Sequence, residues 1–452
     1  MGLGGAMNSG VSGLQAFSNA MSAIGNNLSN ANTAGFKASR TLFADLIPDT
    51  VNGSGGTSQI GRGAGLSTVD NIFTQGSIES TSSNLDLAIE GSGFFIVRNP
   101  DNQTNNYTRA GSFRLDESGY LANPEGYIAQ GYAAREAGGY EDQTGDIRIN
   151  TRSSVPGQAS SEVGLTTNLN ARTDPAASTW SIDAPSDSAD FATTSEVYDS
   201  LGNTHLISTY FEKTGINNWT FHQTVPLADI DNAANNPEDA AGTIAEVNRG
   251  SFSFDSQGLL EEIMPMTYDS ATSTWSNEPP MDSSSSSWPM VTIPSGSLDW
   301  NNGADPSRQL DYEMNVTQFA TDSKVVTQQA DGYSSGYLND ISVDKEGVIT
   351  GTYSNGESRG LAKIALGKFA NNNGLEKLGK NLFRATNASG PADVGTPGSG
   401  LGNIFANSLE QSTVDIAEEF TKMITTQRAF QANSKTITTT DEMLSQVINM
   451  KR

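Results

Sequence analysis

Apolar residues repeat every seven positions at both ends of this 452-residue chain. At the N-terminal end a second apolar row follows three residues behind the first, a spacing typical of a helix with a coiled-coil seam. The C-terminal end carries a similar seam, and Thr413 and Asp415 are candidate caps for its helix. The seam positions are Met7, Leu14, Phe17, Met21, Ile24 and Leu28 at one end and Leu409, Ile416, Phe420, Met423, Phe430, Ile437, Leu444 and Val447 at the other.

One such stripe taken alone fits the core-facing helix of an ordinary domain equally well. Two seams at opposite ends, each bounded by glycine-rich sequence, favour a terminal coiled coil instead. We therefore predict that the seam positions mediate assembly of subunits.

The sequence between the two seams has the pattern of β-structure. A D-x-x-G motif recurs between apolar runs and predicts tight turns, because Asp accepts backbone amides and Gly tolerates positive φ. The four motifs are Asp116–Gly119, Asp199–Gly202, Asp255–Gly258 and Asp344–Gly347. A calcium loop is disfavoured, since Tyr120 and Val348 stand where a third ligand is required.

Three stretches rich in Gly or Ser are candidate linkers or surface loops: Gly53–Gly65, Ser283–Pro289 and Ala388–Gly402. The first and third contain closely spaced glycines. Neither opens a helix after a strand, and no GK[ST] follows, so we do not assign them as nucleotide-binding loops.

The formal net charge is −25, which disfavours nucleic acid as a partner because no basic surface is available to replace phosphate counterions. Residues 48–408 hold 19 Lys and Arg against 44 Asp and Glu, whereas the two ends are nearly neutral. Such a distribution indicates ends that associate and a body that stays solvated. No run of about 18 apolar residues occurs, so we expect no membrane insertion.

The chain has no cysteine, which excludes disulfides, thiolate metal sites and a cysteine nucleophile. The N-terminal sequence MGLGGAMNSG lacks the basic and apolar regions of a signal peptide. If the protein leaves the cell, we expect a specialised export route without a cleaved signal.

We predict no catalytic, cofactor-binding or metal site, and hence no enzyme. His205 and His222 fall in predicted strands, and neither G-x-S-x-G nor H-E-x-x-H occurs. A secreted glycan hydrolase remains an alternative because scattered carboxylates can pair in space. An adhesin is a third reading, although binding a ligand does not require long heptad ends.

Several segments resemble the bacterial flagellar axial proteins, the family of rod and hook proteins. They are Ser29-Asn-Ala-Asn-Thr-Ala-Gly-Phe-Lys37, Asn84-Leu-Asp-Leu-Ala-Ile-Glu-Gly-Ser-Gly-Phe-Phe-Ile-Val97, Tyr107-Thr-Arg-Ala-Gly-Ser-Phe113 and Thr426-Gln-Arg-Ala-Phe-Gln-Ala-Asn-Ser-Lys-Thr-Ile437. The last of these resembles the hook branch in particular. The positions that carry the family motifs are Asn32, Gly35, Phe36, Gly91, Gly93, Phe94, Gln427, Arg428, Asn433 and Ser434.

The resemblance implies a multidomain, mainly β body with N- and C-terminal α-helices that form a coiled-coil inner domain, so that the domains are nested and discontinuous. The expected division is 1–30 with 409–452 as the helical domain, 31–70 as an extended Gly-rich linker, 71–145 with 318–408 as the inner β domain, and 146–317 as an outer β domain, single or double.

The resemblance also implies a function: a hook subunit that polymerises into a flexible hollow tube, joins the rod to the filament and transmits torque. It implies a homo-oligomer of many subunits, and as partners the rod, hook-cap and hook–filament junction proteins and the type III export apparatus. The expected location is the extracellular flagellum at the basal body. The distal rod protein is the alternative within the family, but it lacks an insertion the size of residues 146–317.

Overall fold

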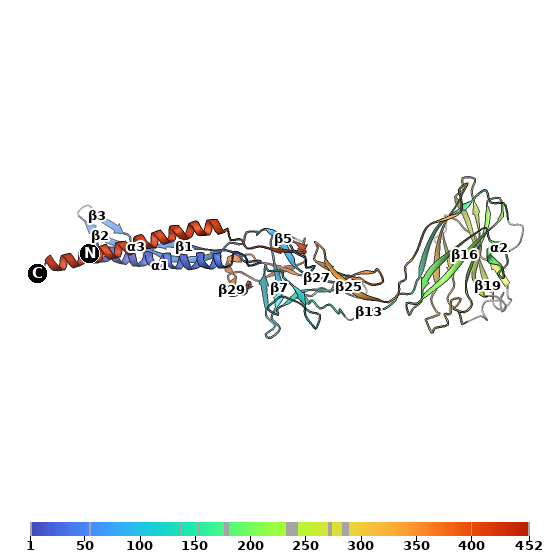
Figure 1. The fold of residues 1–452 in the computed structure, drawn as a ribbon, viewed down its shortest axis with the longest axis horizontal. Helices are drawn as coiled ribbons and strands as arrows, with labels where there is room; N and C mark the ends of the chain where they lie inside the picture. The colour runs from blue at the N-terminus through green and yellow to red at the C-terminus, as the bar shows by residue number, and fades with distance from the viewer. Residues whose placement is uncertain are drawn as a thin grey trace. The chain divides into compact units, whose positions relative to one another are not determined.

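The computed structural model describes residues 2–53, 56–135, 138–151, 154–175, 180–231, 243–269, 274–282, 289–398 and 400–450. The chain forms two compact units, shown in Figure 1. The terminal unit comprises Met1–Thr151, Asp340–Thr352 and Ser358–Arg452, and the middle unit comprises Arg152–Asn339 and Tyr353–Glu357. The predicted loop at Ser283–Pro289 lies outside the described residues except for Pro289.

Two long helices, α1 (Gly2–Ser29) and α3 (Ile416–Met450), lie side by side in the terminal unit (Figure 1). Of the two predicted caps of α3, Asp415 is confirmed, because its Oδ1 accepts the amides of Ala417 (2.8 Å) and Glu418 (3.1 Å). Thr413 does not cap the helix; its hydroxyl accepts the amide of Ala38 (3.0 Å). The placement of Leu409 in the helical seam was wrong. Leu409 belongs to the short strand β33 (Ser408–Glu410), which pairs with β5 (Ile78–Ser80) ahead of the helix.

Residues 31–70 are not the extended linker that their glycines indicated. Strand β1 (Ser39–Asp45) pairs antiparallel with β4 (Ala64–Asn71), and β2 (Asp49–Gly53) pairs with β3 (Gly56–Ile60). Helix α1 covers β1, and the Phe17 ring lies 6.1 Å from the ring of Phe43. The Phe17 ring and the antiparallel partner β4 support β1 from outside the glycine-rich segment, a contribution that the local glycine signal does not reveal.

The rest of the terminal unit is a β body with a small aromatic core. Phe94 packs edge-on against Phe369 and Phe383, and Tyr107 lies 4.7 Å from Phe369 between ring centroids. Several pairings join early to late segments, such as β7 with β28 and β8 with β30. The strands are β6 (Leu87–Glu90), β7 (Phe94–Arg98), β8 (Asn105–Thr108), β9 (Arg114–Leu115), β10 (Leu121–Ala122), β11 (Ile128–Ala133), β12 (Gly145–Asp146), β26 (Val348–Tyr353), β27 (Ser358–Ile364), β28 (Leu366–Lys368), β29 (Glu376–Gly379), β30 (Leu382–Arg384), β31 (Asp393–Gly395) and β32 (Asn403–Ala406).

The middle unit packs a four-stranded sheet, β22-β23-β14-β24, against a larger sheet, β15-β16-β17-β18-β19-β20, with β21 beside β19. Buried residues of both sheets, among them Leu165, Phe211, Trp219 and Tyr312, form one core. A single-turn helix, α2 (Pro185–Ser188), precedes β15. The strands are β13 (Ser154–Val155), β14 (Glu162–Asn170), β15 (Phe191–Tyr198), β16 (Thr204–Gly215), β17 (Asn218–Pro226), β18 (Ile244–Phe254), β19 (Leu260–Asp269), β20 (Thr274–Asn277), β21 (Met281–Asp282), β22 (Met290–Ile293), β23 (Leu310–Phe319), β24 (Lys324–Ala330) and β25 (Gly336–Val343), which crosses into the terminal unit.

The predicted D-x-x-G turns are confirmed. In the turn between β9 and β10, Oδ1 of Asp116 accepts the amides of Ser118 (2.9 Å) and Tyr120 (2.7 Å). Gly119 has φ +83°, a conformation that a residue with a Cβ rarely adopts. The glycines of the other three turns have φ between +76° and +84°. Because each Asp carboxylate accepts hydrogen bonds from the amides of its own turn, we assign these acids a structural role.

Candidate assembly site

Helices α1 and α3 approach closely at two glycines of α1. A Cβ on Gly10 would lie 2.9 Å from Cγ1 of Ile437, and a Cβ on Gly13 would lie 2.8 Å from Oδ1 of Asn433. These glycines lower the helix propensity of α1 by about 1 kcal/mol each relative to Ala. The close approach explains their presence, since the side chains of α3 occupy the space that a Cβ would take.

The structure places the predicted seam residues in several environments. Ile24 is buried, Phe17 faces β1, and Ile437 meets Gly10. Leu14, Met21, Leu28, Met423 and Leu444 are half-buried, whereas Met7, Ile416, Phe420, Phe430 and Val447 are exposed. The contact of Met423, Phe430 and Leu444 with Leu14, Met21 and Leu28 in an assembled state stays a prediction.

The segments that leave the two helices meet at a buried cluster of charges. The Lys37 ammonium donates to Oε1 of Glu410 (2.6 Å), and Nη1 of Arg109 donates to Oε2 of the same carboxylate (3.3 Å). The Glu410 side chain is 0% exposed, and the Lys37 side chain is 1% exposed. Glu410 precedes α3, Lys37 follows α1, and Arg109 belongs to the β body. We call these three residues the charge triad.

Backbone carbonyls accept from further donors of the charge triad, whereas Nε of Arg109 is buried without a hydrogen-bond partner among the described residues. Lys37 also donates to the Thr74 carbonyl (2.6 Å), and Nη2 of Arg109 donates to the Gly91 carbonyl (2.7 Å). Burial lowers the pKa of Lys37 and of Arg109, while the Glu410 carboxylate acts in the opposite direction on both pKa values. Two cations facing one anion leave a net positive charge inside the protein, which the surrounding carbonyl oxygens and the Phe94 ring, 5.3 Å from Cζ of Arg109, partly offset.

Two of the family motifs contact each other beside the triad. Gly35 has φ +71°, and a Cβ on it would lie 2.5 Å from the backbone nitrogen of Ala110. The Gly35 amide donates to the Glu410 carbonyl (2.7 Å). Glycine is therefore required at position 35 for both backbone conformation and space. The contact fixes the end of the α1 segment against the turn that carries Arg109.

A second polar cluster joins both helices to β1. The Asn27 amide of α1 donates to the Ser39 carbonyl (2.7 Å) and to Oε2 of Glu419 on α3 (3.2 Å). Lys422 approaches Oε1 of Glu419 at 2.9 Å. Asn27 and Glu419 are 1% and 5% exposed, so α1 and α3 are fixed in register by a buried hydrogen bond.

The other predicted motif residues divide between core and surface. Phe36 and Phe94 are buried, Gly93 has φ +130°, and the Gly91 amide donates to Gln75 (2.9 Å). On α3, Gln427 and Arg428 are exposed, Asn433 meets Gly13 and Ser434 is half-buried. Asn32 is exposed in the turn after α1.

Sequence reasoning missed Glu410, Glu419, Asn27 and the role of Arg109. Lys37 and Arg109 stand inside recognised motifs beside glycines, so a search for charges in glycine-bounded motifs would have found them. Glu410 lies between Leu409 and Gln411 with no such signal.

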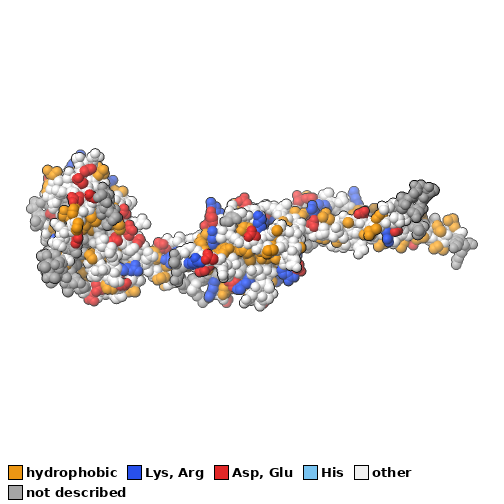
Figure 2. Space-filling view, turned by 180° about the vertical axis from the view of Figure 1, so that it is seen from behind, with side chains coloured by type: hydrophobic (Ala, Val, Ile, Leu, Met, Phe, Trp, Pro, Cys, Tyr) orange, Lys and Arg blue, Asp and Glu red, His pale blue; other side chains and the backbone are white. Residues whose placement is uncertain are grey.

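Apolar side chains remain exposed on the helical pair, on β1, β3 and β4, and between β1 and β2. Figure 2 shows them along the helical region of the terminal unit. Ile424 is 50% exposed, Val447 is 49% exposed and Ile448 is 65% exposed, all on α3. The exposed set is Met7, Val11, Leu42, Phe43, Leu46, Ile47, Ile60, Leu66, Val69, Ile416, Phe420, Ile424, Phe430, Met443, Val447, Ile448 and Met450. A set of this extent is typical of an interaction surface.

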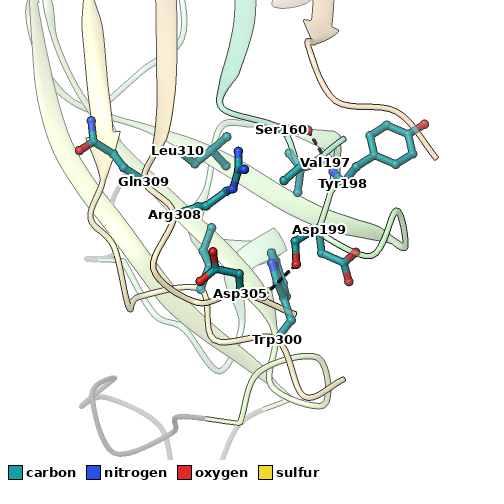
Figure 3. A pocket seen from close by; sticks show the side chains of 12 residues that line it. Ser160, Val197, Tyr198, Asp199, Trp300, Asp305, Arg308, Gln309 and Leu310 are labelled. Atoms are coloured by element: carbon teal, nitrogen blue, oxygen red, sulfur yellow. Dashed lines mark hydrogen bonds between the residues drawn. The ribbon is translucent and has the colours of Figure 1, made fainter. Parts of the chain in front are cut away.

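The middle unit contains a cavity of about 30 Å³, drawn in Figure 3 with Asp199, Trp300, Asp305 and Arg308 among its lining residues. This volume accommodates a water molecule rather than a substrate. In Figure 3 the Ser160 side chain points to Tyr198, whose amide donates to its hydroxyl (3.0 Å). In the described part of the chain, no group of three or more His, Asp or Glu is arranged to hold a metal ion.

The two histidines have structural partners. His205 stacks on Trp300 and contacts Asp199 through Nε2 (3.2 Å), while Nδ1 of His222 contacts Glu246 (2.6 Å). Burial raises the pKa of Asp199, but hydrogen bonds from Asn203, from Asn302 and from His205 outweigh it and lower this pKa to about 2.

Four family profiles match successive parts of the chain. They are "Flagella basal body rod protein" over residues 7–37, "Flagellar hook protein FlgE/F/G D1 domain" over 88–168, "Flagellar basal body protein FlaE D2 domain" over 168–333 and "Flagellar basal body rod FlgEFG protein C-terminal" over 406–450. The flagellar hook protein FlgE of Treponema pallidum (strain Nichols) is 34% identical to this chain over 486 residues, which cover 98% of this chain and 99% of that protein. This chain belongs to the flagellar hook protein family.

Other hook proteins agree over nearly the whole length. The hook protein FlgE of Salmonella typhimurium (strain LT2) is 31% identical over 446 residues, 98% of either chain. The crystal structure of the Helicobacter pylori hook protein FlgE2 has a TM-score of 0.48 and 16% identity, and the match covers 74% of this chain and 100% of that one. The resemblance to the flagellar family and the mainly β fold with terminal helices are thus confirmed, and the chain is a structural subunit of the flagellar hook.

Within the described helices, none combines the length and the apolar character needed to cross a membrane.

Proposed function

We propose that this hook subunit polymerises through its paired terminal helices into a hollow, flexible tube that joins the rod to the filament and transmits torque. The observation that carries the proposal is the α1–α3 pair, which is fixed to the β body by the charge triad yet leaves its apolar side chains exposed. A subunit with such a face gains free energy by packing it against neighbours. Heterologous contacts that do not close into a ring generate an open helical polymer.

The charge distribution supports different roles for the helical ends and the β segments. The nearly neutral helical ends would form a coiled-coil inner wall, and the acidic β segments would stay in contact with water. The nested arrangement is kept with three changes of bounds: the C-terminal helix starts at Ile416, and residues 31–70 pair as strands. The outer β domain extends beyond the predicted 146–317 to Arg152–Asn339 with Tyr353–Glu357, because β24 pairs with β14 of the outer sheet rather than joining the inner β domain. The Gly-rich bends in 31–70 would supply the compliance that curvature needs.

The partners and the route follow from the family. We propose contacts with the rod, the hook cap and the hook–filament junction proteins, export by the flagellar type III apparatus without a cleaved signal, and an extracellular location. The four matched profiles include rod as well as hook descriptions, which supports a shared mode of assembly.

Electron microscopy of purified protein tests the proposal. The full chain, concentrated above its polymerisation threshold or seeded with sheared hooks, should form tubes with a central channel. A chain ending before Ile416 should stay monomeric while its middle unit remains folded. Tubes from the truncated chain would contradict the role of the helices, and the absence of tubes from the full chain would contradict the proposal as a whole.

A further inference from the structure

A cavity of about 280 Å³ lies where the hairpin of β29 and β30 meets the end of α1. Phe36 and Phe383 give it apolar lining, and Asn26, Asn30 and Asn381 give it amides. Lys377 and Lys380 line it from the hairpin, and Lys37, whose ammonium is paired with Glu410, lines it from the segment after α1. Its volume is at the small end of ligand pockets, which span about 300–1,000 Å³, so it suits a single side chain rather than a large cofactor. We call it the hairpin cavity.

The two hairpin lysines have no anionic partner within the described ranges. The ammonium of Lys377 donates to the Ser39 hydroxyl (2.8 Å) and lies 5.4 Å from the centre of the Phe36 ring. Burial lowers the pKa of Lys377, as expected for an ammonium that has lost water without gaining a carboxylate. The nearest acid on the hairpin, Glu376, is paired with Arg384 (2.7 Å).

The hairpin presents these lysines in a fixed geometry. Lys380 and Asn381 have φ +54° and +57°, as in a two-residue turn with both central residues left-handed. The Asn381 amide donates to the Ala34 carbonyl (2.9 Å), which holds the turn against the segment after α1. The backbone of Lys380 is thus placed at the cavity before any ligand arrives, and a preorganised site loses less entropy on binding.

We propose that the hairpin cavity receives a carboxylate side chain from a second copy of this chain. The inference rests on the proposed function, since it requires subunits to meet. Charge complementarity supports it: residues 48–408 carry 44 acids against 19 bases, so a neighbouring copy offers many carboxylates. Glu117 and Glu125, for example, stand exposed on tight turns without an ion pair among the described residues.

A partly enclosed ion pair of this kind contributes to register more than to affinity. Electrostatic complementarity selects one docking arrangement because a displaced copy would leave the lysines unpaired. A competing role for the lysines is local. Helix α1 has no basic residue in its last turn, so its negative C-terminal end could be what Lys377 and Lys380 neutralise.

Zero-length cross-linking of isotopically mixed polymers separates the two roles. Tubes are assembled from equal amounts of ¹⁴N- and ¹⁵N-labelled protein, treated with a carbodiimide and digested. Cross-linked peptides that join Lys377 or Lys380 to an Asp or Glu should carry one light and one heavy half in about half of the molecules, the random expectation for pairs of copies. They should be absent from the monomer. Products with only matching isotopes, or no cross-links at either lysine, would overturn the inference.

Variants give the second measurement. Lys380→Glu should raise the critical concentration for polymerisation about fivefold, the factor that one partly enclosed ion pair is worth. Lys380→Arg should restore it. Lys368→Glu, the same charge change at an exposed lysine outside the cavity, should leave it unchanged. An unchanged critical concentration for Lys380→Glu would overturn the inference while leaving the proposed function intact. Failure of the unmodified chain to form tubes would overturn both.

Discussion

Replacement of Glu410 by Gln removes the only carboxylate of the charge triad while preserving its shape. In the native chain its two oxygens accept from Lys37 (2.6 Å), from the Gly76 amide (2.8 Å) and from Arg109 (3.3 Å). A neutral amide leaves both cations buried without an anion. It also directs an NH₂ group toward one of these donors, so that at least one hydrogen bond becomes repulsive.

Breaking a buried ion pair by removing one partner costs about 3–5 kcal/mol, because the remaining charge stays desolvated. The value for E410Q should lie at the upper end, since two cations lose their partner. We expect this loss in the free energy of unfolding of the terminal unit, measured by urea denaturation of the monomer. Glu79→Gln is the matched control, because Glu79 lies opposite Leu409 on β5 and is exposed. It should change stability by less than about 0.5 kcal/mol.

A double-mutant cycle with Lys37→Met tests the cause. If the loss of stability in E410Q arises from uncompensated charge, the double variant should lose less stability than the two single variants lose together. The difference should be about 0.5–3 kcal/mol. Additive effects, or an E410Q variant no less stable than the Glu79 control, would refute the argument that the triad holds the helices to the body by charge.

Three further predictions concern the helices and the middle unit. Gly13→Leu should displace Asn433, separate α3 from α1 and abolish polymerisation. Gly25→Ala should instead stabilise α1 by about 1 kcal/mol in circular dichroism melts, because a Cβ at position 25 meets nothing within 4 Å. Phe430→Ala should change monomer stability by less than about 1.5 kcal/mol, because Phe430 is 36% exposed in the single chain, yet prevent tube formation if neighbours cover it in the polymer; normal tubes would contradict this. The folded-state pKa of Asp199 is lowered to about 2 from 3.8, so the ionised carboxylate stabilises the folded state fully above about pH 4, and this stabilisation is lost as pH falls through 2. In urea titrations the native chain should therefore be more stable than Asp199→Asn at pH 5, and this difference should shrink by about 2 kcal/mol by pH 2.

Local chemistry made part of the fold predictable. The D-x-x-G turns were correct because the Asp and Gly of each motif act within five residues of chain, whatever surrounds them. The two terminal helices and the Asp415 cap followed from heptad spacing for the same reason.

Long-range packing accounts for the rest. The glycines of Gly53–Gly65 predicted a linker because nothing in that segment reveals that α1 covers the strands on either side of it. Phe17 matched the seam by spacing, yet its partner, Phe43, is on a strand. Glu410 became important only when Lys37 and Arg109 were brought to it from 373 and 301 positions away. Heptad counting also favoured large side chains and overlooked Gly10 and Gly13. Because these glycines have no side chain, Ile437 and Asn433 of α3 can occupy the space beside them.

The middle unit begins and ends at one place, where Gln158 and Tyr333 exchange backbone hydrogen bonds of 2.9 and 3.0 Å. Strands β7 and β8 of the body pair with β28 and β30, which follow the middle unit in the sequence. If the middle unit were unfolded, it would be a long flexible loop between these strands, and the chain entropy lost on closing that loop would oppose the pairing by about 4–5 kcal/mol. Once the middle unit folds, its adjacent ends act as a short connection. We therefore expect an order of folding in which the middle unit, nearly all of it the single run Arg152–Asn339, forms first and the interrupted body closes afterwards. Pulse-labelled amides of β16 and β17 should then gain protection before those of β7 and β8.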